Sequence, residues 1–388
     1  MPILNRVAEL HDEVTGWRRH LHTIPELLYD VHQTAAFVEG KLREFDCDEV
    51  VPGLGRTGVV GIIKGNLGDG PTIGLRADMD ALPLNEITGK PYASQTPGKM
   101  HACGHDGHTA MLLGAAKYLA ETRNFAGSVA VIFQPAEEGG AGGRAMVQDG
   151  MMERFGISRV FGMHNMPGLP VGQFAIRPGP IMAATAEFTI TVKGRGGHAA
   201  MPHGTVDPIV IASQIVQGLQ TIAARSVDPI DSIVVSVTKF HAGDAYNVIP
   251  QEAQLAGTIR TLRTEVGEAS RERMRAICQG IAAAHGATVD VDIDVNYPVT
   301  FNNAEETEFA SGIAIEVAGA PQVNTDINPV MGGEDFSYML EARPGAFIFA
   351  GNGDTANLHN PAYDFNDELI PHGISYWVRL TETALGRA

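Results

Sequence analysis

Cysteine, long apolar runs and basic charge are all scarce in this chain of 388 residues. The three cysteines (Cys47, Cys103 and Cys278) are too few and too scattered for a disulfide framework, which favours a reducing compartment such as the cytoplasm. No apolar run reaches the roughly 18 residues needed to span a bilayer, and the first residues lack the apolar core of a secretion signal. The net charge of −17 argues against nucleic acid or an anionic membrane as the main partner.

The richest local pattern is MHACGHDGHT, residues 100–109, which holds three histidines, a cysteine and an aspartate. Thiolate and imidazole are ligands that transition metals prefer. Cys103 and His105 are two residues apart, so they reach one ion only from an irregular loop, which the flanking glycines permit. The alternative is a polar loop before a helix that begins near Gly107, with Asp106 as its cap.

Further candidate residues share one position, the end of a predicted strand. They are Asp78 and Asp80 after residues 72–76, Glu137 and Glu138 after 128–133, His164 after 159–163, and His359 in the loop after 346–350. In open α/β sheets, ligands gather at the carboxyl ends of the strands, so this convergence predicts a metal site. Adjacent glutamates that are buried need a cation or a proton to offset their repulsion. The alternatives are two solvated loop glutamates and an ordinary turn around the aspartates.

Two other features carry less weight. Gly53, Gly55 and Gly58 spell GxGxxG, but an apolar strand pattern follows where a dinucleotide-binding motif needs a helix, so a nicotinamide oxidoreductase is disfavoured. His20 and His22 lie at the end of a predicted first helix, where cationic side chains are common, and we assign them no functional role.

The 388 residues exceed the size of one ordinary core, so two domains are expected. Residues 186–296 show the order β-α-β-β-α-β, a ferredoxin-like α+β unit complete in itself. Helix and strand patterns of an α/β domain with a mostly parallel sheet precede it, over residues 1–185, and resume over 297–388. The sequence therefore predicts a metal-binding α/β domain with an inserted second domain, in which an edge strand is a natural place for dimer formation.

Eight segments resemble the amidohydrolase branch of the binuclear-metal aminoacylase and carboxypeptidase family: RADMDALP, HACGHDGH, QPAEEG, VFGMHN, GRGGHAAMPH, YNVIP, GTIRT and GGEDFS. That branch includes hippurate hydrolases, N-acyl-amino-acid amidohydrolases and auxin-conjugate hydrolases. The resemblance extends over nearly the whole chain. It implies a catalytic α/β domain interrupted by a lid domain that usually dimerises, giving a homodimer or higher homo-oligomer.

The resemblance also implies roles for individual residues. The metal ligands would be Cys103, His105, Glu138, His164 and His359, holding two divalent ions, zinc or manganese, with cobalt or nickel as further possibilities. Glu137 would be the general base, and Asp80 would orient the site. His198 would stabilise the oxyanion, and Asn247 and Arg260 would hold the substrate's carboxylate. The chain departs from most peptidase branches at Asp78, where they have a histidine, and at Cys103, which leaves the metal open.

The resemblance implies hydrolysis of the amide bond of a small N-acyl amino acid. A dipeptidase or carboxypeptidase that uses the same metal centre is the alternative. A non-catalytic metal-binding or ligand-binding protein is a third possibility, but it would need neither Glu137 nor His198.

Overall fold

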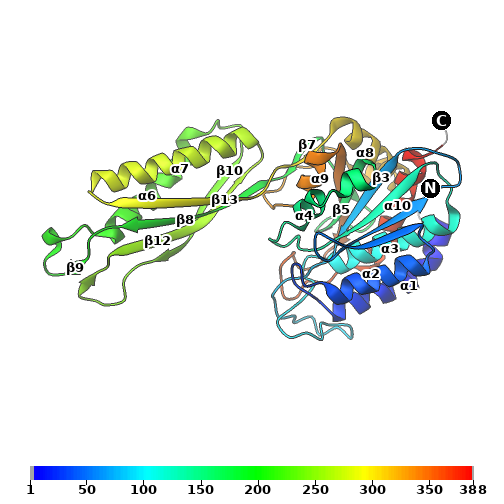
Figure 1. The fold of residues 1–388 in the computed structure, drawn as a ribbon, viewed down its shortest axis with the longest axis horizontal. Helices are drawn as coiled ribbons and strands as arrows, with labels where there is room; N and C mark the ends of the chain where they lie inside the picture. The colour runs from blue at the N-terminus through cyan, green and yellow to red at the C-terminus, as the bar shows by residue number, and fades with distance from the viewer. Residues whose placement is uncertain (1–3, 387–388) are drawn as a thin grey trace. The chain divides into compact units, whose positions relative to one another are not determined.

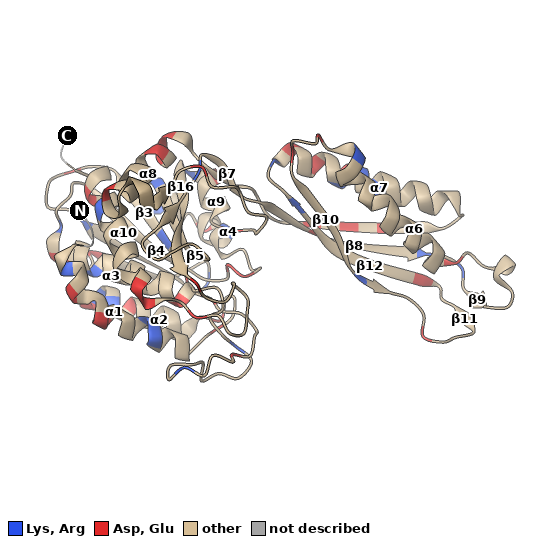
Figure 2. Ribbon diagram, turned by 180° about the vertical axis from the view of Figure 1, so that it is seen from behind, with Lys and Arg blue, Asp and Glu red and all other residues tan. Residues whose placement is uncertain are grey.

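The computed structural model describes residues 4–386, which form two compact units (Figure 1). The first unit comprises Met1–Ile181, Phe301–Asn328 and Asp335–Ala388, and the second comprises Met182–Thr300 and Pro329–Glu334. The short segment 329–334 thus joins the second unit, although the predicted boundaries leave it in the first domain. Figure 2 shows that acidic and basic residues occur over both units.

The first unit is built on a mixed sheet that, within residues 4–386, has eight strands in the order β1-β2-β4-β3-β5-β16-β6-β15. Its central strands β4, β3, β5 and β16 are all parallel. The strands are β1 (Glu49–Leu54), β2 (Gly58–Lys64), β3 (Thr72–Asp78), β4 (Ser128–Gln134), β5 (Ile157–Pro167), β6 (Phe174–Ala175), β15 (Val323–Asn324) and β16 (Gly345–Gly353). Nearly every side chain of β2, β3, β4 and β16 is buried, as expected for strands covered on both faces.

Helices cover this sheet, and α3 lies at the centre of one helical layer. It packs against both α1 and α10. Gly114 makes the close packing possible, because a Cβ atom there would lie 2.5 Å from Ile374. The helices of this unit are α1 (Asn5–Thr23), α2 (His32–Glu44), α3 (His105–Thr122), α4 (Gly142–Gln148), α5 (Met151–Arg154), α8 (Ala304–Ala318), α9 (Ser337–Ala342) and α10 (Ile370–Ala384).

Several details differ from the sequence-based expectation. His105 does not lie in an irregular loop but is the first residue of α3, because Gly104 adopts a left-handed conformation (φ 89°) and starts the helix early. His164 lies within β5, which continues to Pro167, and Asp78 is the last residue of β3. The GxGxxG segment lies in the antiparallel hairpin of β1 and β2, so a strand follows its glycines, as the sequence predicts.

The second unit has the predicted order β-α-β-β-α-β. Its antiparallel sheet, as described, has the order β10-β12-β8-β13, with α6 and α7 on one face (Figure 1). Asp207 caps α6 by accepting a hydrogen bond from the Ile209 backbone, and Pro208 begins the helix, both as the sequence predicts. The elements are β8 (Ala184–Lys193), α6 (Pro208–Thr221), β10 (Ile233–His241), β12 (Glu252–Thr261), α7 (Thr264–Ala284) and β13 (Thr288–Tyr297).

Short elements complete the chain. Two two-stranded ribbons pair β9 (Gly197–His198) with β11 (Val248–Ile249), and β7 (Gly179–Met182) with β14 (Thr300–Asn302). Single helical turns lie at Pro202–Gly204, Ile222–Ser226, Ala320–Gln322 and Asp367–Leu369. Through residues 4–386, every helix is too short or too polar to cross a bilayer.

Candidate metal centre

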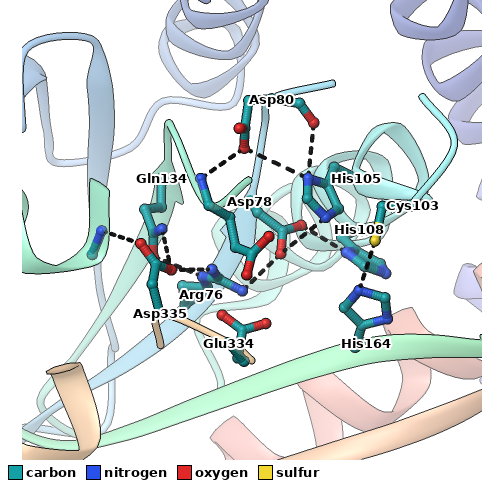
Figure 3. Close-up of polar contacts among 12 residues, drawn as sticks. Arg76, Asp78, Asp80, Cys103, His105, His108, Gln134, His164, Glu334 and Asp335 are labelled. Atoms are coloured by element: carbon teal, nitrogen blue, oxygen red, sulfur yellow. Dashed lines mark hydrogen bonds and ion pairs between the residues drawn. The ribbon is translucent and has the colours of Figure 1, made fainter. Parts of the chain in front are cut away.

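The candidate residues of the first unit lie at the carboxyl ends of its parallel strands, where Figure 3 shows Asp78, Asp80, Cys103, His105 and His164 close together. The parallel strands β3, β4, β5 and β16 are neighbours, so their carboxyl ends meet there. Asp78 ends β3, Glu137 and Glu138 follow β4, His164 lies in the second half of β5, and His359 lies in the loop after β16. Chain topology therefore brings together residues that are up to 281 positions apart, from Asp78 to His359 (359 − 78).

All five predicted metal ligands form one cluster. The Sγ atom of Cys103 lies 3.4 Å from Nε2 of His164. The Oε1 atom of Glu138 lies 3.9 Å from Nε2 of His105 and 3.4 Å from Nε2 of His359. Donor atoms of Cys103, Glu138 and His359 lie within 4.8 Å of one another, as do those of Cys103, His105 and His164.

Backbone hydrogen bonds fix the tautomers of two of these histidines. Nδ1 of His105 lies 2.8 Å from the backbone oxygen of Asp80, and Nδ1 of His164 lies 2.6 Å from that of Asn165. A carbonyl oxygen only accepts, so each Nδ1 carries a hydrogen and each neutral ring presents the lone pair of Nε2 to the cluster. This is the arrangement by which second-layer groups orient metal-binding imidazoles.

The donor atoms suit a divalent ion. Nε2 of His105 and Oε1 of Glu138 are buried, and neither makes a hydrogen bond of good geometry within the described chain, although Oε1 lies at ion-pair distance from His105 and His359. Buried polar atoms without such hydrogen bonds are costly, and these two face each other across the cluster. One thiolate, three imidazoles and a carboxylate form a donor set typical of transition-metal sites. These residues therefore fit the metal ions that the sequence resemblance implies.

The charges of the cluster also favour a cation. Burial alone would lower the pKa of His105, but Asp78, Asp80 and Glu138 outweigh it and raise the pKa to about 10. Burial, together with nearby carboxylates, raises the pKa of the Cys103 thiol well above its usual value. A divalent cation would replace the proton on His105 and stabilise the Cys103 thiolate.

Asp80 holds the two glutamates in place. Its Oδ1 accepts a hydrogen bond of 2.9 Å from the backbone N–H of Glu137, and its Oδ2 accepts one of 3.1 Å from Glu138. Glu137 is only 8% exposed. One of its carboxylate oxygens lies within 4.8 Å of a ring nitrogen of His105 and of a carboxylate oxygen of Glu138. The predicted base therefore lies beside the predicted ligands.

A buried network behind the ligands was not predicted. Asp78 forms an ion pair of 2.7 Å with Arg76 and a second hydrogen bond of 2.7 Å with Nδ1 of His108. Arg76 also binds Asp335 at 3.0 Å, and Asp335 accepts a hydrogen bond of 2.6 Å from Gln134. Burial raises the pKa of Asp335 to about 6, although Arg76 opposes this. Asp335 belongs to the GGEDFS motif, which was noted in the sequence but assigned no role.

His22 lies in the last turn of α1, as the sequence predicts, and it also has a structural role there. Its ring is buried, with Nδ1 2.7 Å from Asp106 and Nε2 3.3 Å from Glu86. Arg18 lies 3.1 Å from the same Asp106 carboxylate. Asp106 is therefore not a helix cap; it connects α1 to the first turn of α3, immediately beside His105.

The other three predicted residues belong to the second unit, whereas the ligand cluster belongs to the first. His198 is exposed on β9, where it pairs with Val248. Asn247 is also exposed, and its backbone oxygen accepts a hydrogen bond of 3.0 Å from the backbone N–H of Ala199. Arg260 is half-buried on β12.

Residues 74–383 match the family model described as peptidase family M20/M25/M40. The chain belongs to this family. It is therefore an amide-hydrolysing enzyme, as the sequence resemblance implied.

Several known proteins are similar to this chain over nearly its whole length. It is 43% identical to hippurate hydrolase from Campylobacter jejuni over 380 residues, 98% of each chain. It is 40% identical to N-acetylcysteine deacetylase from Bacillus subtilis over 377 residues, 97% of each. A crystal structure of a Bacillus subtilis dinuclear metal-binding peptidase of the M20 family superposes with a TM-score of 0.85 at 37% identity, covering 97% of this chain and 99% of that one. The α/β fold with an inserted domain is thus confirmed.

Proposed function

We propose that this enzyme hydrolyses the amide bond of N-acyl amino acids, releasing a carboxylic acid and a free amino acid. The observation that carries the proposal is the cluster of Cys103, His105, Glu138, His164 and His359 with Glu137 beside it. The names of hippurate hydrolase and N-acetylcysteine deacetylase support it, because both denote cleavage of an acyl group from an amino acid.

The five clustered side chains would hold two divalent ions, zinc or manganese, with cobalt or nickel as alternatives. Sulfur and nitrogen donors favour zinc, while the carboxylate leaves room for manganese. Bound there, the ions would supply Lewis-acid chemistry, polarising the amide carbonyl and lowering the pKa of water from 15.7 towards about 7. Asp80 contributes by fixing the loop that carries both Glu137 and Glu138.

Glu137 transfers the proton in this mechanism. Its carboxylate takes a proton from the attacking water as the new C–O bond forms at the amide carbon. The same group then gives that proton to the amide nitrogen as the C–N bond breaks, so that the amino acid leaves as a neutral amine. A carboxyl group beside the reacting atoms serves both steps, since it is a base before the first and an acid before the second.

The second unit would supply the groups that contact the rest of the substrate. His198 stabilises the negative charge that develops on the carbonyl oxygen. Arg260 pairs with the substrate's carboxylate, and Asn247 donates a hydrogen bond to it. Arg260 suits this role because it is half-buried and burial lowers the pKa of its guanidinium, so a substrate carboxylate would offset the cost of its buried charge.

We further propose that the enzyme is a homodimer or higher homo-oligomer, associated through an edge strand of the second unit. Among the described strands, β10 is at one edge of the sheet and exposes Val234 and Phe240. An edge strand with exposed apolar side chains is a natural site for pairing between copies. The use of Cys103 as a thiolate ligand suits a reducing compartment, so we propose the cytoplasm as its location.

The proposal is tested by a substrate panel of hippurate, N-acetylcysteine and dipeptides, with defined metals and with a chelator. We expect hydrolysis of the acylated amino acids that the chelator abolishes and that added zinc or manganese restores. A dipeptidase or carboxypeptidase is the alternative, since the same centre and Arg260 would equally accept a peptide with a free C-terminal carboxylate. Faster cleavage of dipeptides than of both acyl amino acids would favour that alternative.

A further inference from the structure

We propose that Asn165 is a positioning residue that sets the relative places of the segments that carry the metal ligands. It follows His164 on β5 and is 1% exposed. The inference rests on the proposed function in one respect, that the clustered side chains hold metal. It assigns Asn165 no contact with substrate.

The amide nitrogen of Asn165 fixes the Cys103 segment. Its Nδ2 donates a hydrogen bond of 2.6 Å to the backbone oxygen of Cys103. The same amide group lies 3.1 Å from Nε2 of His108 on α3, and the backbone N–H of Asn165 donates to that nitrogen at 3.0 Å. Nε2 of His108 is therefore an acceptor, and the hydrogen of the ring is on Nδ1, which donates to Asp78 at 2.7 Å.

The amide oxygen of Asn165 fixes the His359 segment. It accepts a hydrogen bond of 2.7 Å from the hydroxyl of Tyr363, four residues after His359. The backbone N–H of His359 in turn donates to Ala102 at 2.8 Å, and His359 has a left-handed backbone (φ 60°) that is costly for a non-glycine residue. The Tyr363 contact helps to hold the loop in this strained conformation, with the imidazole of His359 beside Glu138.

One side chain thus connects the segments of Cys103, His164 and His359. The packing around it leaves little room for another arrangement, because a Cβ atom on Gly104 would lie 2.3 Å from Nδ2 of Asn165 and 2.6 Å from the Tyr363 hydroxyl. A side-chain amide has two N–H donors on its nitrogen, which faces Cys103 and His108, and an acceptor oxygen, which faces Tyr363. An aspartate would direct an oxygen at the Cys103 carbonyl, where two acceptors repel.

The experiment measures cobalt binding to the full-length enzyme, by competition with a chelator and by the thiolate-to-cobalt charge-transfer band of Cys103. We expect Asn165→Ala to weaken cobalt binding roughly 10–100-fold and to shift or abolish that band, as for other groups that orient ligands. Asn302→Ala is the matched control. Asn302 is equally buried and also makes three hydrogen bonds, but to Arg177 and Phe347, which carry no ligand. It should lose stability and keep both cobalt affinity and the band.

Tyr363→Phe covers the case in which Asn165→Ala does not fold. It removes one hydrogen bond, keeps the ring, and should weaken cobalt binding severalfold. The inference would be overturned if Asn165→Ala kept the cobalt affinity and the charge-transfer band of the wild type. If Asn165→Ala cannot be obtained, the same result in a folded Tyr363→Phe variant would overturn it. So would an equal loss of affinity in Asn302→Ala. If the wild type binds cobalt with the charge-transfer band but hydrolyses no acyl amino acid, the proposed function fails and the inference about Asn165 stands.

Discussion

The functional candidates of the two units differ in how they are held. In the first unit the side chains of Cys103, His105 and His164 are buried, that of Glu138 is partly buried and that of His359 is exposed. Asp80, Asn165 and Asp78 fix the segments or rings around them by hydrogen bonds of 2.6 to 3.1 Å. In the second unit, His198 and Asn247 are exposed on a ribbon of two-residue strands. Nδ1 of His198 accepts a hydrogen bond of 3.1 Å from the backbone N–H of Ala200. The first set is therefore held mainly by buried groups, and the second by hydrogen bonds at the surface.

This difference separates two contributions to catalysis. Fixed, buried groups act without reorganising, and electrostatic interactions among them are strong because water is excluded. Exposed groups gain comparable strength only when substrate or another part of the protein covers them. We therefore expect the first unit to determine metal binding and proton transfer, and the second to determine oxyanion stabilisation and substrate affinity. Substitutions in the two units test this division.

The largest effect is expected for Glu137→Gln, which removes the proton acceptor and keeps the shape of the side chain. We expect kcat to fall by roughly 10²–10⁴-fold with metal content unchanged. The measurements are steady-state kinetics and elemental analysis. Glu138→Gln is the neighbouring comparison, and it should lose metal as well as activity. A Glu137→Gln enzyme with more than a tenth of the wild-type rate, on the order of one kcal/mol in the barrier, would rule out this base.

His198→Ala should have the next largest effect. Removal of one oxyanion donor typically lowers kcat by roughly 10²–10³-fold. Metal content and the stability of the first unit should stay as in the wild type, because His198 belongs to the second. His203→Ala is the control, since His203 is also exposed and lies five residues away (203 − 198). Equal kinetics for both variants would show that the second unit supplies no such donor.

The buried charges of the first unit predict a stability that depends on pH through His22. Burial alone would lower its pKa, but Asp106 and Glu86 outweigh it and raise the pKa to about 9. This raised pKa stabilises the folded state fully below the unfolded value of about 6.5, and the contribution is lost as pH rises towards 9. The contribution, on the order of 3 kcal/mol, follows from a difference of about 2.5 pH units.

Chemical denaturation of the metal-free protein at about pH 6 and about pH 10 measures this term. The wild type should lose more free energy of unfolding between the two pH values than His22→Gln does. His20→Gln is the control, because His20 is exposed on the same helix and its ring packs against Phe37. If His22→Gln and the wild type show the same pH dependence, His22 is not protonated in the folded protein.

That candidate ligands meet at one place could be predicted from the sequence because several of them follow predicted strands, whereas the full set of five ligands was implied only by the family resemblance. Glu137 and Glu138 follow a buried strand, and His164 lies towards the carboxyl end of another. Parallel strands bring such positions to one edge of the sheet, so strand assignment predicts that Glu137, Glu138 and His164 lie together. It does not by itself place Cys103, which directly follows no strand. The two-residue shift that put His105 on α3 depends on the left-handed backbone of Gly104, which periodicity does not reveal.

The groups behind the ligands could not be predicted in the same way. His22 and Asp106 are 84 residues apart, and their contact depends on how α1 packs against α3. Asn165 resembles any polar residue of a strand until the fold places Cys103 and Tyr363 on either side of its amide. Such roles depend on tertiary contacts between segments that have no common local pattern.

The smallest effect is expected for Arg260→Lys, and it tests whether the second unit acts on affinity alone. A lysine keeps the charge but loses the paired geometry that a guanidinium offers a carboxylate. We expect KM to rise roughly 10–100-fold with kcat nearly unchanged, which corresponds to the roughly 1.5–3 kcal/mol of a charged hydrogen bond. Arg263→Lys is the control, because Arg263 is exposed and pairs with Asp231. A substrate whose carboxylate is replaced by an amide should not distinguish Arg260→Lys from the wild type, since it lacks the group that Arg260 binds. If that substrate shows the same rise in KM, Arg260 acts on the fold of the second unit and not on the substrate.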